Sequence, residues 1–348
     1  MSRAIRRFGL AVASAAGSLW ILFTASDTFA QEVSPSQRVS PSSRQVSYAA
    51  IFGNHPFVLP KWDNGFLISW IYDDPARSQN ENLVVYDRDG KLVGKTRLWP
   101  AGATTVRIRD ADIRSDGEIA VVGHVINESG QFAAFMAEVS IPAGKVHVVQ
   151  TSPFEGQAVT FGPDGTIWVL GYQTDIHRNL SKTDHYLIEE FGKDDVLLGQ
   201  YLPRSEFPCS THPAMQGNGQ SPRIAASADR VGFYAPACRM WVELSASGKW
   251  LGQWRWQSGP LDARGRDTTP IMDLTLTSTN EVYAVKSLPT EYSLVRLDRG
   301  SSTWTTIDTS AVENEGNPFT WLEGSDGDSL VYLSTDKRVA WTKLQSTP

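Results

Sequence analysis

The chain has 348 residues, of which 41% are hydrophobic and 20% charged, and its formal net charge is -6. An acidic chain without clusters of Lys and Arg is a poor binder of nucleic acid or of anionic membranes. Its 28 Gly, 19 Pro and 12 Trp favour many short strands joined by turns over long helices. The length is enough for one large or two medium domains.

The N-terminal thirty residues predict a secretory signal peptide. Arg3, Arg6 and Arg7 form a basic start, residues 9–25 carry no charge, and small residues lead to a cleavage site after Ala30. Cleavage would remove three Arg and one Asp and change the formal charge from -6 to -8. We therefore expect a secreted or periplasmic protein that has no membrane attachment once the signal is removed.

Two alternatives remain open for this segment. The Arg6-Arg7 pair raises the twin-arginine export route, although "IRRFGLA" lacks the usual polar residue before the pair. The seventeen uncharged residues of 9–25 are also near the lower limit for an uncleaved membrane anchor. Residues 31–45 are rich in Ser and Pro and predict a flexible leader between the signal and the folded domain.

A strand, a tight turn and a second apolar strand recur along the rest of the chain. Asp-Gly between two apolar runs is a strong hairpin signal, because the central residues of such turns adopt positive φ. The units read "WDNGFLISWI" (62–71), "ADIRSDGEIAVVG" (111–123), "AVTFGPDGTIWVLG" (158–171), "RIAASADRVGFYA" (223–235), "DLTLTSTNEVYAV" (273–285) and "WLEGSDGDSLVYL" (321–333).

The first apolar residues after these turns are separated by 52, 48, 64, 51 and 48 residues; they are Leu67, Ile119, Ile167, Val231, Val282 and Leu330. A second phrase, "DRDGKLVGK" (87–95), returns as "GKDDVLLGQ" (192–200) and "SASGKWLGQ" (245–253) with a compatible period. A period near fifty residues with four short strands is typical of a β-propeller blade.

We therefore predict an all-β, six-bladed propeller of four-stranded antiparallel blades over residues 46–348. The last unit is one outer strand short before the chain ends at Pro348. An extra strand-like segment, "VSYAAIFG" (46–53), precedes the first unit. We expect this N-terminal strand to pair beside residues 338–344 and to close the ring, which would remove an exposed terminal edge.

The phrases "AVTFGPDGTIWVLG" (158–171) and "HYLIEEFGKDDVLLGQ" (185–200) resemble the NHL-type and TolB-like six-bladed β-propellers. This resemblance implies the architecture and leaves the activity open, because such propellers include lactonases, quinoprotein dehydrogenases and binding platforms. A lactonase site would need a Glu with amide and carboxylate ligands. Glu323, Asp110 and Asp273 are the nearest residues here, and they have no convincing Asn partners.

The strand order of a blade assigns the loops to two faces. Turns between strands one and two and between strands three and four are tight, and we call their side the tight-turn face. The other connections include every long loop, and they define the loop-rich face; these loops are 72–82, 171–184, 203–222, 257–270 and 310–318. Long loops on a rigid scaffold usually carry binding, so we expect function on the loop-rich face.

Several residues of the loop-rich face are candidates for binding. The insertion before blade four contains Cys209, and the only other cysteine, Cys238, follows the second strand of the same blade. In an exported chain the two predict a disulfide. The candidate binding residues are Asp175, His177, His185, His212 and Arg239. Asp175, His177, Asp184 and His185 could be metal ligands, but their spacing matches no short zinc motif, so we predict no metal and no cofactor.

A second set of candidates belongs to the mouth of the central channel. Asp110 and Asp273 stand nine residues before their anchors, at the entry of an inner strand, where they could bind a cation or share a proton. The alternative is that each serves its own turn or pairs with a nearby arginine, and we favour it. Arg109, Arg223 and Glu323 complete this set.

The prediction for function is a monomeric binding or interaction module that uses the loop-rich face. Its ligand, a small molecule or a protein, is unknown. The alternative is a propeller enzyme, either a metal-dependent lactonase or hydrolase or a quinoprotein-type oxidoreductase, with its site at the channel mouth. An enzyme requires several polar side chains to converge there, including Asp110 and Asp273.

Overall fold

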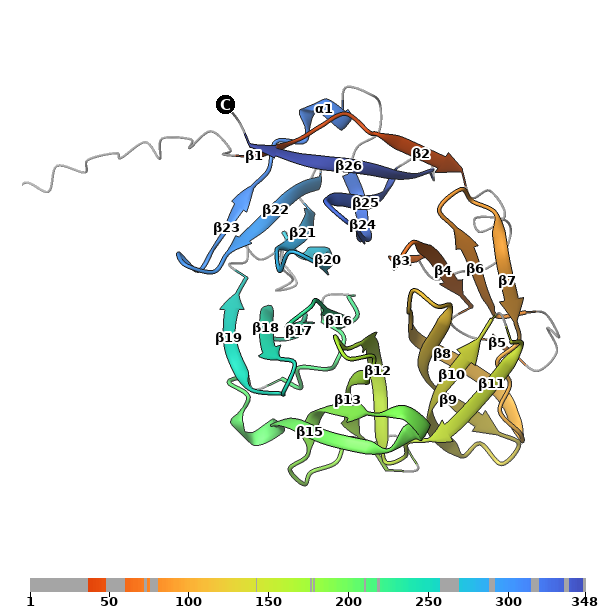
Figure 1. Cartoon of the computed structure of the whole chain (residues 1–348). Coiled ribbons are helices and arrows are strands. Elements are labelled where there is room, and N and C mark those ends of the chain that lie inside the picture. The colour runs from red at the N-terminus through yellow and green to blue at the C-terminus, as the bar shows by residue number, and fades with distance from the viewer. Residues whose placement is uncertain are drawn as a thin grey trace, which may run out of the picture. The chain divides into compact units, whose positions relative to one another are not determined.

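Six antiparallel sheets, four of four strands and two of five, are arranged around a central axis in the computed structural model of the chain (Figure 1). The protein is a six-bladed β-propeller, as the sequence predicts. The structure describes residues 37–47, 60–71, 74–75, 81–141, 143–175, 177, 179–209, 211–217, 220–256, 269–287, 292–313, 319–334 and 338–346.

Each blade runs from an inner strand at the axis to an outer strand at the rim (Figure 1). Blade one contains β3 (Lys61–Asp63), β4 (Phe66–Trp70), β6 (Leu83–Asp87) and β7 (Leu92–Thr96). Blade two contains β8 (Ala103–Ile113), β9 (Glu118–Asn127), β10 (Phe132–Ser140) and β11 (Lys145–Gln150), with β5 (Asp74–Pro75) beside β8. Blade three contains β12 (Phe154–Phe161), β13 (Ile167–Gln173), β14 (Tyr186–Phe191) and β15 (Leu197–Pro203).

The second half of the ring repeats this order. Blade four contains β16 (Arg223–Ala226), β17 (Arg230–Ala235), β18 (Met240–Ser245) and β19 (Trp250–Arg255). Blade five contains β20 (Ile271–Leu276), β21 (Val282–Ser287), β22 (Tyr292–Asp298) and β23 (Thr303–Thr306). Blade six contains β24 (Phe319–Asp326), β25 (Ser329–Ser334) and β26 (Arg338–Ser346). The described helical segments are short: η1 (Lys193–Asp195), η2 (Arg204–Glu206) and α1 (Ser310–Glu313).

N-terminal chain supplies the outer edge of blade six. Both β1 (Gln37–Val39) and β2 (Arg44–Ser47) pair antiparallel with β26. The first two residues of the predicted closing strand, 46–53, pair with β26, and residues 48–53 lie outside the described residues. The predicted flexible leader, 31–45, is corrected at its C-terminal end, because residues 37–39 and 44–45 belong to this sheet.

The repeated phrase forms the outer hairpin of its blade. Its glycines Gly94, Gly199 and Gly252 occupy the same place, opposite Val85, Glu190 and Glu243 of the third strand. In all three blades the register shifts by one residue immediately after this pair. Such a β-bulge bends the outer strand and increases its twist, which explains why the phrase recurs with its glycine.

Apolar side chains fill the space between adjacent blades. Each described interface has its own core, such as the one around Trp168, Phe233 and Val242 between blades three and four. Trp62 of blade one meets Trp341 of blade six edge to face, with ring centroids 4.9 Å apart. Gly324 lies where β24 approaches β3, and a Cβ there would be 2.1 Å from the Trp62 carbonyl oxygen. This contact between blades therefore requires glycine.

Candidate functional site

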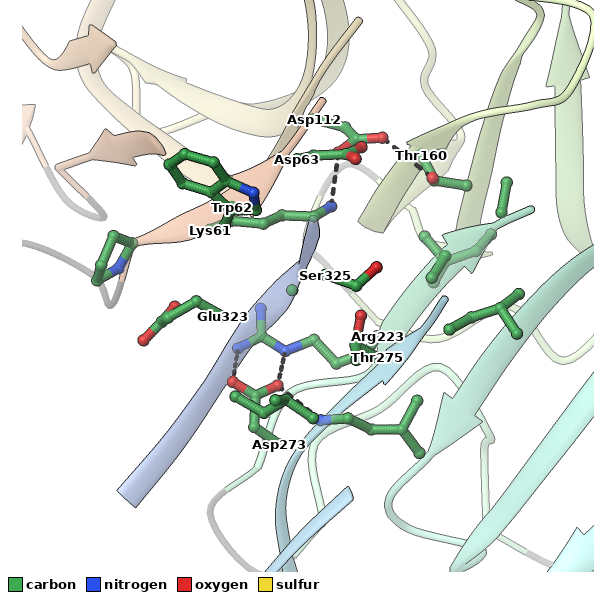
Figure 2. Close-up of a pocket in the computed structure, with 18 residues that line it drawn as sticks. Lys61, Trp62, Asp63, Asp112, Thr160, Arg223, Asp273, Thr275, Glu323 and Ser325 are labelled. Carbon is green, nitrogen blue, oxygen red and sulfur yellow. Dashed lines mark hydrogen bonds and ion pairs between the residues drawn. The ribbon is translucent and has the colours of Figure 1, made fainter. Parts of the chain in front are cut away.

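The inner strands surround a small polar cavity on the propeller axis (Figure 2). Its volume is about 60 Å³, which leaves room for a few water molecules at most. Its charged lining residues come from five of the six inner strands and include Lys61, Asp63, Asp112, Arg223, Asp273 and Glu323. The cavity is too small for an organic substrate.

Two carboxylates of blade two hold the inner strand of blade three. Asp110 accepts a hydrogen bond from the Val159 backbone N–H at 2.9 Å. Asp112 accepts one from the Phe161 backbone N–H at 2.9 Å and another from the Thr160 hydroxyl at 3.0 Å. The inner strand of blade three, β12, has no further strand to pair with on its inner edge, so these carboxylates satisfy donors that would otherwise be buried without a partner.

Lys61 of blade one also contributes to this contact between blades two and three. Its Nζ lies 3.1 Å from Asp112 Oδ1 and 3.8 Å from Asp110 Oδ2, and it donates to the Val159 carbonyl oxygen at 3.2 Å. Burial lowers the pKa of Lys61, but the carboxylates of Asp110 and Asp112 outweigh that effect and raise it overall. The ammonium group therefore stays charged and links the inner strands of blades one, two and three.

Arg223 and Asp273 form the second ion pair of the channel. Arg223 Nε lies 3.1 Å from Asp273 Oδ1, and Nη2 donates to Oδ2 at 3.2 Å. Asp273 Oδ1 also accepts the Leu274 backbone N–H at 2.8 Å. This bidentate contact joins the inner strands of blades four and five, as the structural alternative for Asp273 requires.

The two further carboxyls in the cavity, those of Glu323 and Asp63, lack partners as strong as the arginine that binds Asp273. Glu323 is only 5% exposed, and its Oε1 has no hydrogen-bond partner. Burial and the neighbouring Asp273 raise the pKa of Glu323 well above its usual range. Burial and the neighbouring Asp112 have the same effect on the pKa of Asp63. Both groups are therefore easier to protonate than ordinary surface carboxyls.

Replacing Glu323 with glutamine is expected to flatten the pH dependence of stability. A carboxyl whose pKa is raised by folding favours the folded state at low pH, and that contribution is lost as pH rises through the folded-state pKa. The wild-type protein should therefore lose stability above pH 4.5, by at most about 1.4 kcal/mol per pH unit for this group. Urea unfolding of both proteins between pH 4.5 and 8 measures the difference. A variant curve parallel to the wild-type curve would contradict this assignment.

The structure places four of the five predicted channel residues near one another. Asp110, Arg223, Asp273 and Glu323 belong to the charged channel, whereas Arg109 is the extra residue of a β-bulge in β8 and contacts a separate pair of side chains. There the Arg109 guanidinium lies 3.5 Å from Glu155, which also contacts His124 at 3.3 Å. Sequence reasoning missed three channel residues: Lys61, Asp63 and Asp112.

The predicted disulfide is confirmed: Cys209 and Cys238 are bonded, with their Cα atoms 5.8 Å apart. Near them, His185 Nε2 lies 3.0 Å from His212 Nε2, and the two rings stack with centroids 5.2 Å apart. Burial, with His185 and Arg204 nearby, lowers the pKa of His212 to about 3. A neutral ring can accept the hydrogen bond that joins the two histidines.

A second connection ties the insertion to blade three. Asp184 accepts hydrogen bonds from the backbone N–H and the hydroxyl of Ser205, at 2.9 and 2.5 Å. Arg204 donates to the Cys209 carbonyl oxygen at 2.9 Å. We call residues 184–185, 204–209, 211–212 and 238–239 the loop platform. It is held in place by the disulfide, by the histidine pair and by these hydrogen bonds.

The remaining loop candidates have other positions. Asp175 accepts the backbone N–H groups of His177 and Asn179, each at 2.8 Å, and so forms a turn of its own in which His177 is exposed. Arg239 belongs to the loop platform and adopts a φ of 54° in the turn that carries Cys238. The structure therefore groups His185, His212 and Arg239 with the disulfide.

Replacing both cysteines with serine is expected to lower the free energy of unfolding by about 3 kcal/mol. The bond closes a loop across 29 residues, and an unfolded chain without that link gains about this much conformational free energy. Thermal unfolding of the wild type, the double variant and the reduced wild type measures the effect. Identical stability of oxidised and reduced protein would show that the bond does not constrain the chain.

The largest hollow on the axis opens on the tight-turn face. Its volume is about 690 Å³, and turns of all six blades line it; they include Asn64, Ser115, Pro163, Ser227, Ser278 and Gly327. We call this hollow the axial bowl. It shares Asp63, Thr160 and Ser325 with the small charged cavity, so the cavity lies at its floor. The sequence did not predict a hollow on this face.

Within the part of the chain that the structure describes, no three or more His, Cys, Asp or Glu residues are grouped so that they could hold a metal ion. No helix among the described residues is long and apolar enough to cross a membrane. The charged channel residues instead bind one another and the backbone of neighbouring blades.

No protein-family model matches the chain. No curated protein matches it either. Among solved structures, it is similar to a Bacteroides fragilis protein provisionally named as exported, with 11% identity, a TM-score of 0.52, and coverage of 90% of this chain and 96% of that one.

Two other solved structures are similar over most of their length. The propeller domain of the Trilobed protease from Pyrococcus furiosus is 11% identical, with a TM-score of 0.43 and coverage of 83% of this chain and 96% of that one. A glucose dehydrogenase is 10% identical, with a TM-score of 0.44 and coverage of 89% and 99%. Similarity at this level of identity concerns the fold alone.

Proposed function

We propose that this propeller is an exported binding module that holds a protein or small-molecule partner on its loop-rich face. The observation that carries the proposal is the loop platform. A disulfide, a histidine pair and the Asp184–Ser205 hydrogen bonds fix an insertion that lies between blades three and four. Loops that are ordered before binding lose less conformational entropy when a partner arrives, so their affinity is higher.

The contacts of the channel carboxylates favour a binding function over a catalytic one. Asp110, Asp112 and Asp273 are engaged with backbone N–H groups and with buried cations. The cavity between them holds a few waters and leaves no place for a substrate. An enzyme of the lactonase or quinoprotein kind would need these groups directed at a ligand.

The compartment and the assembly state are part of the same proposal. Residues 1–30 would direct export and be removed after Ala30. The disulfide supports this, because disulfides form and persist in oxidising compartments. We place the protein in the periplasm or outside the cell, as a monomer that does not bind nucleic acid. The acidic charge of the chain supports that last point.

Site-specific photo-crosslinking tests the proposed face. A photoreactive amino acid is placed at Met215, which lies in the insertion and is 37% exposed, or at Leu92, which is 45% exposed on the outer hairpin of blade one. In the cells that make the protein, we expect a discrete crosslinked species from position 215 and none from position 92. If the partner is a small molecule, native mass spectrometry of the two purified proteins detects it as added mass.

Replacing both cysteines with serine should abolish the crosslink at position 215, while Glu323→Gln should leave it unchanged. Equal crosslinking from both positions, or crosslinking from position 92 alone, would contradict the assignment to the loop-rich face. A crosslinked partner that depends on Glu323 and not on the disulfide would contradict the assignment to the loop platform.

A further inference from the structure

Carboxyl groups outnumber cations in and beside the channel cavity. Five carboxyls, Asp63, Asp110, Asp112, Asp273 and Glu323, meet two cations, Lys61 and Arg223, in the described part of the channel. The two cations are already engaged, Lys61 with Asp110 and Asp112 and Arg223 with Asp273. Three more positive charges or protons would make this set of side chains neutral.

We propose that the channel binds a primary ammonium group that enters through the axial bowl, that Glu323 is the carboxylate that receives it, and that Asp63 attracts it where the bowl meets the cavity. This site lies on the tight-turn face and is separate from the loop platform.

Glu323 is the residue that points to a missing ligand. Its side chain lines the cavity, the residue is only 5% exposed, and its Oε1 has no hydrogen-bond partner (Figure 2). The nearest cation, Arg223, is bound on two atoms by Asp273. Buried polar atoms without a partner are costly, so they usually mark a group that a ligand or solvent completes.

The channel already binds one ammonium group, that of Lys61. Lys61 places its Nζ between Asp112 Oδ1, at 3.1 Å, and the Val159 carbonyl oxygen, at 3.2 Å, with Asp110 nearby. A second ammonium group would find carboxyl oxygens of the same kind at Asp63 and Glu323, which line the same cavity. The inner strands thus present one type of acceptor along the axis.

The size of the cavity selects among cations. A volume of about 60 Å³ accepts a compact ammonium head, which carries three hydrogen-bond donors on a narrow stem. A guanidinium is planar and wider, and a trimethylated ammonium has no donor and a larger head. A divalent metal would need three or more grouped ligands, and the described residues hold none so arranged.

The axial bowl supplies the entrance. Asp63, Thr160 and Ser325 line both hollows, so a ligand in the bowl reaches the cavity directly. The bowl, at about 690 Å³, has space for the rest of a molecule whose unbranched alkyl chain ends in the ammonium group. A free alkylamine and the side chain of a lysine in a partner protein share this chemistry.

Binding of the alkylammonium group should release protons from Asp63 and Glu323. Asp63 faces Asp112 and Lys61, and Glu323 faces Asp273 and Arg223; in each case burial and the like charge raise the pKa of the carboxyl. An alkylammonium stays charged until about pH 10. The affinity should therefore increase as pH rises from 5 to 8, while fewer protons are released on binding at the higher pH.

Calorimetric titration with butylamine and with Nα-acetyl-lysine methylamide tests the proposal. Titrations at pH 6 and 8, in buffers of different ionisation enthalpy, give the affinity and the number of released protons. We expect one site, stronger at pH 8, and at least tenfold weaker binding in Asp63→Asn and in Glu323→Gln. The matched control is Asp194→Asn, an exposed carboxyl outside both hollows and outside the loop platform, which should bind like the wild type.

The two ligands distinguish the sources of the ammonium group. Equal affinity indicates a free amine, and tighter binding of the lysine derivative indicates a protein side chain; both results support the site. Ethylguanidine and butyltrimethylammonium should fail to compete. Absence of amine binding to the wild type at pH 8, or variants that bind as tightly as the wild type with unchanged thermal stability, would overturn the proposal.

Discussion

Replacing Asp112 with alanine should lower the free energy of unfolding by about 3 kcal/mol or more. The side chain is 1% exposed and holds three partners: the Lys61 ammonium, the Phe161 backbone N–H and the Thr160 hydroxyl. Alanine would leave the ammonium and both donors buried without their acceptor, which costs more than the lost contact itself. Urea unfolding followed by tryptophan fluorescence measures the loss.

The matched control for this variant is Asp116→Ala. Asp116 is 55% exposed and pairs with Arg114 in the neighbouring turn, so its removal should cost less than about 1 kcal/mol. If Asp112→Ala were as stable as this control, the channel carboxylates would not join the blades. They would then be free for another role, and the channel would not be structural.

Replacing Glu243 with alanine should have a comparable effect between blades four and five, about 3 kcal/mol. Glu243 is fully buried and accepts hydrogen bonds from Trp241 at 2.7 Å, from Arg230 at 3.0 Å and from Arg299 at 3.0 Å. Arg299 follows the third strand of the next blade. The two arginines are 20% and 26% exposed, so water would hydrate them in part and limit the loss.

Two further variants test whether the burial of Glu243 and its hydrogen bonds cause this loss of stability. Arg299→Met should cost less than Glu243→Ala, because Glu243 would keep Arg230 and Trp241 as partners. Glu281→Ala removes a carboxyl that is 39% exposed and should cost less than about 1 kcal/mol. Equal losses for Glu243 and Glu281 would show that burial of the carboxylate does not decide its contribution.

The hairpins were predictable because their signals are local. Asp-Gly turns, positive φ at residues such as Gly117 and Gly165, and alternating apolar residues depend on a few neighbouring positions. The recurring phrase was predictable for the same reason, and the bulge at Gly94, Gly199 and Gly252 gives it a physical cause.

The channel was predicted only in part, because turn lengths differ between blades. Counting nine residues back from the anchor reaches Asp110 and Asp273, but in blade one it reaches Val58. The turn of that blade contains only Asn64 and Gly65, so its channel residues Lys61 and Asp63 lie closer to the anchor. Asp112 could have been found from the two-residue period of a strand, which places it on the same side as Asp110.

The axial bowl and the pairing of N-terminal chain depend on contacts between distant segments. Six turns from six blades surround the bowl, and their small polar residues carry no signal when they are considered one turn at a time. The register of β1 and β2 on β26 is set by partners three hundred residues away, such as Val39 opposite Leu344 and Val46 opposite Val339. The Ser/Pro-rich composition around these strands concealed them.

Native mass spectrometry with elemental analysis, on protein purified from the compartment to which it is exported, tests the central claim most directly. If the channel is structural and the propeller is a binding module, wild-type protein should carry no stoichiometric metal or quinone. Any partner retained on the loop-rich face should be lost when Cys209 and Cys238 are replaced by serine. One metal ion or quinone per chain, lost in Asp112→Ala or Glu323→Gln and retained without the disulfide, would contradict the account.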